Sequence, residues 1–186
     1  MKLFNKKILI VILIIIILKI LVGKTYFPLY PGIPIYPDNN SEVELVKQFI
    51  DSRTQADIDF FYKTNQSVVY AFLDEVNEDY DHLEFIELSI APIIFLLKYV
   101  INRARPNQID NTIYPLNIDT AETPAYPAGH AFQAYYLSKY LSKKYPDKAE
   151  RFQEIAEKCD KIRVIAGLHY PSDGQISKVL VDTFFN

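Results

Sequence analysis

The chain has 186 residues, of which 49% are hydrophobic and 23% charged, so it is long enough for one domain with its own core plus an appendage. A formal net charge of −3 provides no general attraction to nucleic acid, and we expect no nucleic-acid partner. The single cysteine, Cys159, excludes an internal disulfide and leaves the compartment open.

The first 24 residues differ from the rest of the chain. Three lysines precede an apolar run over residues 8–22, which only Lys19 interrupts. This pattern is typical of a signal peptide or a single membrane anchor. No clear cleavage site of the small-x-small kind follows, so we expect an uncleaved anchor through residues 8–22; the alternative is secretion after signal cleavage. The lysines favour a cytoplasmic N-terminus and a C-terminal domain on the other side of the membrane.

Residues 25–40 contain four prolines among aliphatic and tyrosine residues, which predicts an extended linker. From residue 41 to residue 186 the pattern is helical and indicates one domain. The first helices are expected to begin at Ser41 in a capping box with Glu44, at Thr54 in a capping box with Asp57, and near Ser67, where a helix runs to Val76.

Residues 82–103 are predicted to form a long helix that is apolar on most sides, which is typical of the central helix of a bundle. Pro92 is expected either to kink this helix or to start a new segment. The apolar stretch between Glu87 and Lys98 is too short for a second membrane span.

Pro106 is expected to end that helix, and residues 107–127 to form a loop. Further helices are predicted over residues 129–145, over residues 147–167 and from Pro171 to the C-terminus. Strand patterns are absent from the sequence. The predicted fold class is therefore all-α, a compact bundle of about six helices with an N-terminal hydrophobic anchor or signal helix.

Three groups of residues have the chemistry of an anion site. The first is Lys98 and Arg105, which are seven residues apart and would leave the same face of one helix about 10 Å apart along its axis. Side chains of this length converge readily on one anion. Taken alone, such a pair is more often part of a solvated helical face.

The second group is Gly129 and His130, at the start of a predicted helix. Gly129 allows the backbone to approach a ligand closely, and the helix N-terminus directs free N–H groups and partial positive charge outward. His130, in the first turn, would contact the same ligand. Taken alone, the stretch is more typical of an ordinary loop-to-helix junction with a surface histidine.

The third group is Arg163, His169 and Asp173. Gly167 is expected to stop one helix and Pro171 to start the next, which places His169 in a tight turn and Asp173 in the first turn of the last helix. Asp173 would then hydrogen-bond one imidazole nitrogen and leave the other free as a nucleophile. Taken alone, these are equally a capping aspartate and a half-buried histidine.

In this order the three groups resemble the three-part motif of the phosphatidic acid phosphatase type 2 and haloperoxidase superfamily, closest to its class A acid phosphatases. The matching residues are Lys98-x6-Arg105-Pro106, Pro127-Ala128-Gly129-His130 and Arg163-x5-His169-x3-Asp173. The resemblance covers roughly residue 41 to the C-terminus. Ala128 and Ile162 stand where the family usually has serine. The serine at the Ala128 position donates a hydrogen bond to phosphate, and such a bond is worth about 1–3 kcal/mol.

The resemblance implies a metal-independent phosphomonoester hydrolase with no cofactor. His169 would attack phosphorus to form a phosphohistidine, Asp173 would orient His169, and His130 would act as general acid and then general base. Phosphate would be bound by Lys98, Arg105, Gly129 and Arg163. The expected partner is a phosphomonoester, either a small molecule or a lipid phosphate.

Three other functions stay open at this point. The same anion pocket would hold vanadate in a haloperoxidase. His130, His169 and Asp173 would be the ligands of a zinc hydrolase, although the nearby cations would repel a divalent ion. An anchored bundle without catalysis would be a phosphate- or phospholipid-binding module, which Ala128 keeps open. The sequence indicates no particular oligomeric state.

Overall fold

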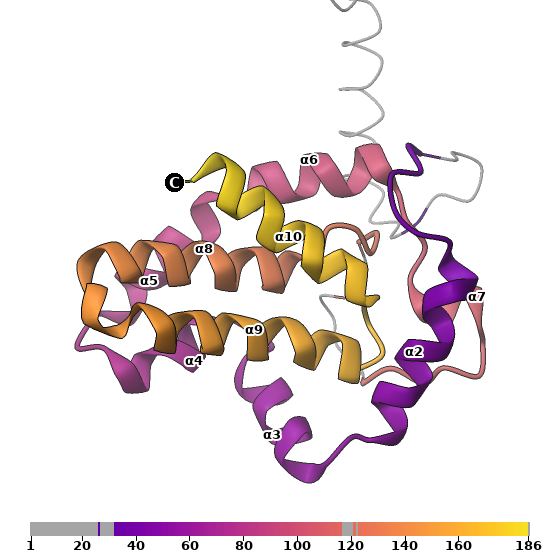
Figure 1. Cartoon of the computed structure of the whole chain (residues 1–186), viewed down its shortest axis with the longest axis horizontal. Coiled ribbons are helices and arrows are strands. Elements are labelled where there is room, and N and C mark those ends of the chain that lie inside the picture. The colour runs from indigo at the N-terminus through magenta and orange to yellow at the C-terminus, as the bar shows by residue number, and fades with distance from the viewer. Residues whose placement is uncertain (1–25, 27–31, 117–120, 122, 186) are drawn as a thin grey trace, which may run out of the picture.

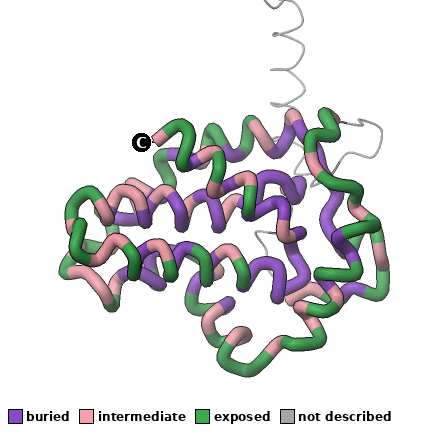
Figure 2. The backbone as a smooth tube through the Cα atoms, viewed as in Figure 1, coloured by how far each residue is buried: buried purple, intermediate pink, exposed green. Residues whose placement is uncertain are grey.

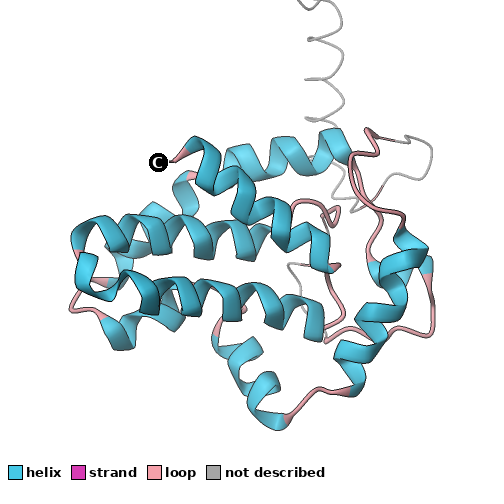
Figure 3. Cartoon of the chain, in the orientation of Figure 1, coloured by secondary structure: helices cyan, strands magenta, loops and turns pink. Residues whose placement is uncertain are grey.

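The computed structural model describes residue 26, residues 32–116, residue 121 and residues 123–185, and these residues form helices and loops without a strand (Figure 3). The all-α prediction is confirmed for this part of the chain. The predicted anchor over residues 8–22, and residues 27–31 of the predicted linker, lie outside the described residues. Within the described ranges, no helix combines the length and apolar character needed to cross a membrane.

Seven helices of nine residues or more make up the described bundle, where about six were predicted. In chain order the elements are α2 (Asn39–Asp51), α3 (Gln55–Lys63), the short α4 (Val69–Phe72) with a 3-10 turn (Leu73–Glu75), α5 (Tyr80–Ser89), α6 (Ala91–Ile101), the short α7 (Pro106–Ile109), α8 (Gly129–Lys144), a 3-10 turn (Pro146–Lys148), α9 (Ala149–Ile165) and α10 (Pro171–Phe184).

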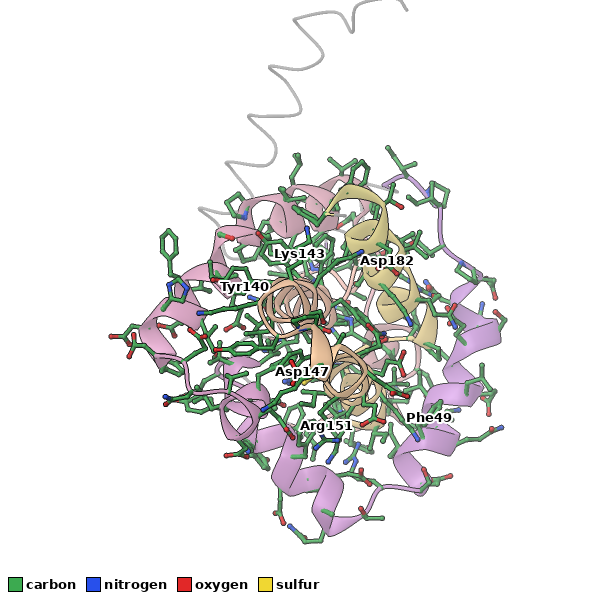
Figure 4. All side chains as sticks on the ribbon, turned by 60° about the vertical axis from the view of Figure 1, so that its left-hand side comes forward. Phe49, Tyr140, Lys143, Asp147, Arg151 and Asp182 are labelled. Carbon is green, nitrogen blue, oxygen red and sulfur yellow. The ribbon has the colours of Figure 1, made fainter. Side chains whose placement is uncertain are left out.

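Helices α8 and α9 are the centre of the bundle. They lie antiparallel and side by side in Figure 1, and Figure 4 looks nearly along both, with Asp147 in the turn that joins them. Their facing sides are buried, as Figure 2 shows, and contribute Phe132, Leu137, Leu141 and Phe152 to the largest apolar cluster. Because all four side chains are at most 1% exposed, this helix pair provides a rigid base for the loops at its ends.

Two of the predicted helix starts can be checked in atomic detail. The capping box of Thr54 and Asp57 is confirmed: Asp57 N donates to Thr54 Oγ1 at 3.2 Å, and Thr54 N donates to Asp57 Oδ2 at 2.9 Å. The predicted start at Ser41 is wrong. Asp38 caps α2 instead, because its carboxylate accepts a hydrogen bond from Ser41 N at 3.2 Å.

The single helix predicted over residues 82–103 is two helices. The helical run breaks at Ile90, and Pro92 lies in the first turn of α6, where its missing N–H costs nothing. Helix α6 ends at Ile101 rather than at Pro106, because Asn102 adopts a left-handed conformation with φ of 54°. Pro106 instead begins α7, within the segment predicted as a loop.

The prediction that this apolar segment lies at the centre of the bundle is also wrong for α6. Ile93, Phe95 and Leu96 are 44%, 42% and 47% exposed, whereas Ile94 and Lys98 are buried. In Figure 1, α6 lies at the outer edge of the molecule, with α8 and α9 between it and α3. When apolar residues are distributed evenly around a helix, their positions in the sequence do not indicate which face packs against the core.

The ends of the last three helices agree with the predictions to within two residues. Helix α8 begins at Gly129, α9 ends at Ile165, and α10 begins at Pro171. Gly167 has a φ of +77°, and an added Cβ there would lie 3.1 Å from Ile50 Cδ1, so a glycine is needed both for the turn and for the packing. This turn brings residue 169 back toward the start of α8.

Candidate active site

A cavity of about 220 Å³ lies between α6, the N-terminus of α8 and the turn before α10. Five of the seven predicted site residues line it, namely Lys98, Arg105, Gly129, His130 and His169. The other two, Arg163 and Asp173, are buried and do not line the cavity. Residues from three distant parts of the sequence therefore meet at one place.

His169 lies on the wall of this cavity and is held from behind by Asp173. The imidazole Nδ1 donates to Asp173 Oδ2 at 3.1 Å, since a carboxylate oxygen accepts. The Nε2 atom is then unprotonated, and its lone pair accepts a long hydrogen bond of 3.4 Å from Arg105 NH1. Burial, together with the charge of Arg105, lowers the pKa of His169 to about 3, so the ring is neutral at physiological pH.

Asp173 is fully buried at the first turn of α10, where three donors satisfy it. Arg103 NH1 donates to Oδ1 at 2.7 Å, and Oδ2 accepts from Tyr170 N at 2.9 Å as well as from His169. Burial by itself raises the pKa of Asp173, but the hydrogen bond from His169 and the charge of Arg103 outweigh it, and the pKa is lowered. The carboxylate therefore stays ionised beside the imidazole.

Arg103 is a central part of the site that the sequence analysis missed. It is fully buried and pairs with two carboxylates, Asp173 at 2.7 Å and Glu42 at 2.7 Å. Its guanidinium carbon lies 3.8 Å from the ring centre of Tyr170 and 4.6 Å from that of Tyr36. Nothing in the local sequence separates Arg103 from an ordinary exposed arginine, because both of its partners are at least sixty residues away in the chain.

Lys98 and Arg105 reach the cavity from different elements. Because α6 ends at Ile101, the prediction that both leave one helical face is wrong, although both line the cavity. Lys98 Nζ donates to Pro124 O at 2.5 Å and to Ala125 O at 3.3 Å. Arg105 donates to Thr123 O at 2.8 Å through Nε and to Leu168 O at 3.0 Å through NH1. Backbone carbonyls thus fix both cations.

These carbonyl contacts hold the two cations without neutralising them. Among the described residues, no carboxylate forms an ion pair with Lys98, Arg105 or Arg163. Burial and the charge of Arg105 lower the pKa of Lys98 well below its usual range, and burial lowers the pKa of Arg105 to about 10. Unbalanced buried positive charge of this kind favours an anionic ligand.

The N-terminus of α8 meets the same cavity at Gly129. Ala128 precedes it with no side-chain cap, so the side chain of the cap residue does not occupy the first N–H groups of the helix. A Cβ added at Gly129 would lie 3.6 Å from both Ile94 Cγ2 and Lys98 Cε, which is ordinary contact. The protein alone therefore does not require glycine here, and the space kept free belongs to the cavity.

Ala128 itself is fully buried and does not line the cavity. Its N–H donates to Asp173 O at 3.0 Å, and its carbonyl accepts from Ser177 Oγ at 3.0 Å. These hydrogen bonds join the start of α8 to the first two turns of α10. The position where the family usually has serine therefore couples two of the three groups, although it supplies no hydroxyl to the cavity.

His130 and Arg163 share a neighbour, Asn65, that sequence reasoning did not single out. His130 Nε2 lies 3.0 Å from Asn65 O, and because a carbonyl only accepts, Nε2 carries the proton. Burial and the charge of Arg163 lower the pKa of His130 well below its usual range. Arg163 donates to Thr64 O at 2.5 Å, while its buried Nε has no partner among the described residues.

The described residues contain no group of three His, Cys, Asp or Glu side chains placed to hold a metal ion, and His130, His169 and Asp173 do not form one. No protein-family model matches the chain, and no curated protein is significantly similar to it.

Proposed function

We propose that the protein is a metal-independent phosphomonoester hydrolase that acts through a phosphohistidine intermediate. The observation that carries this proposal is the neutral His169, whose unprotonated Nε2 faces Arg105 NH1 at 3.4 Å while Asp173 holds Nδ1. A nucleophile, its orienting acid and cations that pair with no described carboxylate are the parts that phosphoryl transfer requires. The resemblance of the motif to phosphatidic acid phosphatase type 2 enzymes points to the same chemistry.

In the first step, the Nε2 lone pair of His169 attacks phosphorus, and the P–O bond to the leaving alcohol breaks. The cations Lys98 and Arg105, together with the amide N–H of Gly129, stabilise the negative charge on the equatorial oxygens. The imidazolium that forms donates from Nδ1 to Asp173, whose ionised carboxylate stabilises it. Arg163 stands behind His130 and contributes positive charge to the pocket.

The proton of the leaving oxygen is assigned to His130. Its Nε2–H is engaged by Asn65 O, so Nδ1 is the nitrogen left for proton transfer. In the empty site the ring is neutral, and a bound phosphate dianion raises its pKa by supplying negative charge. In the second step, His130 accepts a proton from water, which attacks phosphorus, breaks the P–N bond and releases inorganic phosphate.

The decisive experiment measures hydrolysis of p-nitrophenyl phosphate by the full chain, in excess chelator and with and without orthovanadate. We expect turnover that survives the chelator and is inhibited by vanadate, and a radioactive phosphate label on histidine after acid-free quenching. The His169→Ala variant should lose both turnover and label. Wild-type activity in that variant would rule out the assigned role of His169.

A non-catalytic phosphate-binding module is the second candidate, and two observations favour it. Ala128 provides no hydroxyl to the cavity, and His130 is tied to a backbone carbonyl through Nε2. Binding of phosphate or vanadate by calorimetry, with no hydrolysis and no label on His169, would support this candidate over the enzyme.

A further inference from the structure

Helices α5 and α6 present a continuous run of exposed apolar side chains. Phe85 and Leu88 of α5 are 71% and 53% exposed, and Ile93, Phe95 and Leu96 of α6 are 44%, 42% and 47% exposed. We call these five residues the α5–α6 face. Exposed apolar residues in such a cluster are typical of contact with a protein or a membrane.

The outer side of α6 carries no charge. Between Ser89 and Asn102 the only charged residue is Lys98, which is buried and directed into the cavity. A helix exposed to water usually has a polar outer face, because apolar residues on that face stay in contact with water and add no burial energy. The sequence of α6 therefore suits an apolar environment outside the protein as well as the cavity inside.

The α5–α6 face is also the rim of the candidate active site. Leu88 and Phe95 are exposed and line the cavity, whereas the cations Lys98 and Arg105 are at most 5% exposed. The cavity thus has a cationic floor and an apolar entrance. Whatever covers the α5–α6 face lies directly at this entrance.

The path of the N-terminal chain indicates what that environment is. A Cβ added at Gly32 would lie 1.9 Å from Ile101 O, so the backbone at residue 32 rests on the last residue of α6. The predicted anchor ends ten residues earlier, at residue 22, and ten residues reach at most about 35 Å. Helix α6 itself is only about 16 Å long. Ile33 and Ile35, 48% and 61% exposed, add further apolar surface where the chain arrives.

We infer that the α5–α6 face rests on a lipid bilayer, the one in which the predicted anchor over residues 8–22 would be embedded, with the entrance of the cavity turned toward the lipid. The anchor would be tethered beside α6 and would keep this face close to the membrane. A second copy of the chain seated here would cover Leu88 and Phe95 and with them the cavity entrance. A fluid lipid surface leaves that entrance open to molecules within the bilayer.

The test uses the absence of tryptophan from the chain, which makes a single introduced tryptophan an unambiguous probe. The full chain is reconstituted in phosphatidylcholine vesicles, and tryptophan fluorescence is compared with and without lipids brominated on their acyl chains. The test variants are Ile93→Trp and Leu96→Trp on α6. The matched controls are Leu45→Trp on α2 and Tyr62→Trp on α3, which are 43% and 55% exposed.

We expect brominated lipid to quench the α6 probes roughly threefold more strongly than the controls, because an interfacial apolar face sits about 5–10 Å into the boundary of headgroups and acyl chains. Equal quenching of all four probes would overturn the inference. So would α6 probes that are shielded from aqueous acrylamide but insensitive to brominated lipid, the outcome of a protein partner or a second copy. Because the readout is lipid contact, the result is independent of whether the protein hydrolyses phosphate.

Discussion

Removing the charge of Arg103 should both destabilise the fold and disturb the site, because this one guanidinium neutralises two buried carboxylates. In the Arg103→Met variant, Glu42 and Asp173 would remain at 7% and 0% exposure without a cation. Breaking a buried ion pair from one side costs about 3–5 kcal/mol. For a domain of this size that loss corresponds to a fall in Tm of about 6–20 °C.

The same substitution should change the pH dependence of turnover. Arg103 helps to lower the pKa of Asp173, so without it that pKa rises, and a protonated Asp173 has no negative charge to stabilise the imidazolium of His169. We expect kcat/KM to fall about 10–100-fold, by analogy with outer partners that orient metal ligands, and its acid limb to move to higher pH. The Arg103→Lys variant keeps a charge beside Asp173, so its acid limb should stay near that of the wild type.

Two further variants separate a general packing defect from the electrostatic role. Arg103→Met combined with Glu42→Gln removes one of the two unpaired carboxylates, and it should regain at least about 1 kcal/mol of stability without regaining activity. The control Arg151→Met removes an arginine whose side chain is 54% exposed, so the free energy of unfolding should change by less than about 0.5 kcal/mol. Urea unfolding followed by circular dichroism measures each value. A loss below about 1 kcal/mol for Arg103→Met, or an unmoved acid limb, would refute this reasoning.

Three other substitutions should have different effects on ligand binding and on the pH dependence of stability. Gly129→Ala should change the free energy of unfolding by less than about 1 kcal/mol, because the added Cβ fits the surrounding protein. The same Cβ would intrude on a bound ligand, so orthovanadate binding measured by calorimetry should weaken at least about tenfold. Burial raises the pKa of Asp160 from 3.8 to about 6, so the contribution of Asp160 to stability is lost as the pH rises through about 6. Asp160→Asn should therefore be more stable than the wild type at pH 8, by at most about 3 kcal/mol, and equally stable near pH 4. The pKa of His169 is about 3 in the folded state against 6.5 in the unfolded state, so the wild type should lose stability as the pH falls below 6.5. His169→Asn should lose less stability over this range. The same pH dependence of unfolding free energy for both proteins from pH 7 to pH 4 would contradict this.

The sequence predicted those parts of the fold that depend on local signals. The capping box of Thr54, the turn at Gly167 and the start of α10 at Pro171 each follow from the preferences of one or two residues, and each is found as predicted. For the break between α5 and α6, the sequence predicts either a kink or a new helix start, because a proline in an apolar run fits both. The place of α6 in the bundle was predicted wrongly.

The site divides in the same way. Spacing alone brought His169 and Asp173 together, because a tight turn followed by a helix start fixes their separation. Lys98 and Arg105 were predicted to meet for a reason that does not hold, since Asn102 ends α6 between them. Arg103 and Glu42 could not be found from spacing, because their pairing joins residues sixty-one positions apart and depends on how α2 packs.

Arg103 and Arg105 show why two similar side chains, two residues apart, have opposite electrostatic roles. Arg103 faces two carboxylates, so its charge is cancelled within the protein and it can only support Asp173. Arg105 faces the carbonyls of Thr123 and Leu168, which orient its guanidinium, and no carboxylate of the described residues cancels its charge beside His169 Nε2. A buried cation held only by dipoles destabilises the empty protein, as its lowered pKa reflects, and that cost is recovered when an anion binds. The surroundings of each guanidinium therefore make one arginine structural and leave the other available to a ligand.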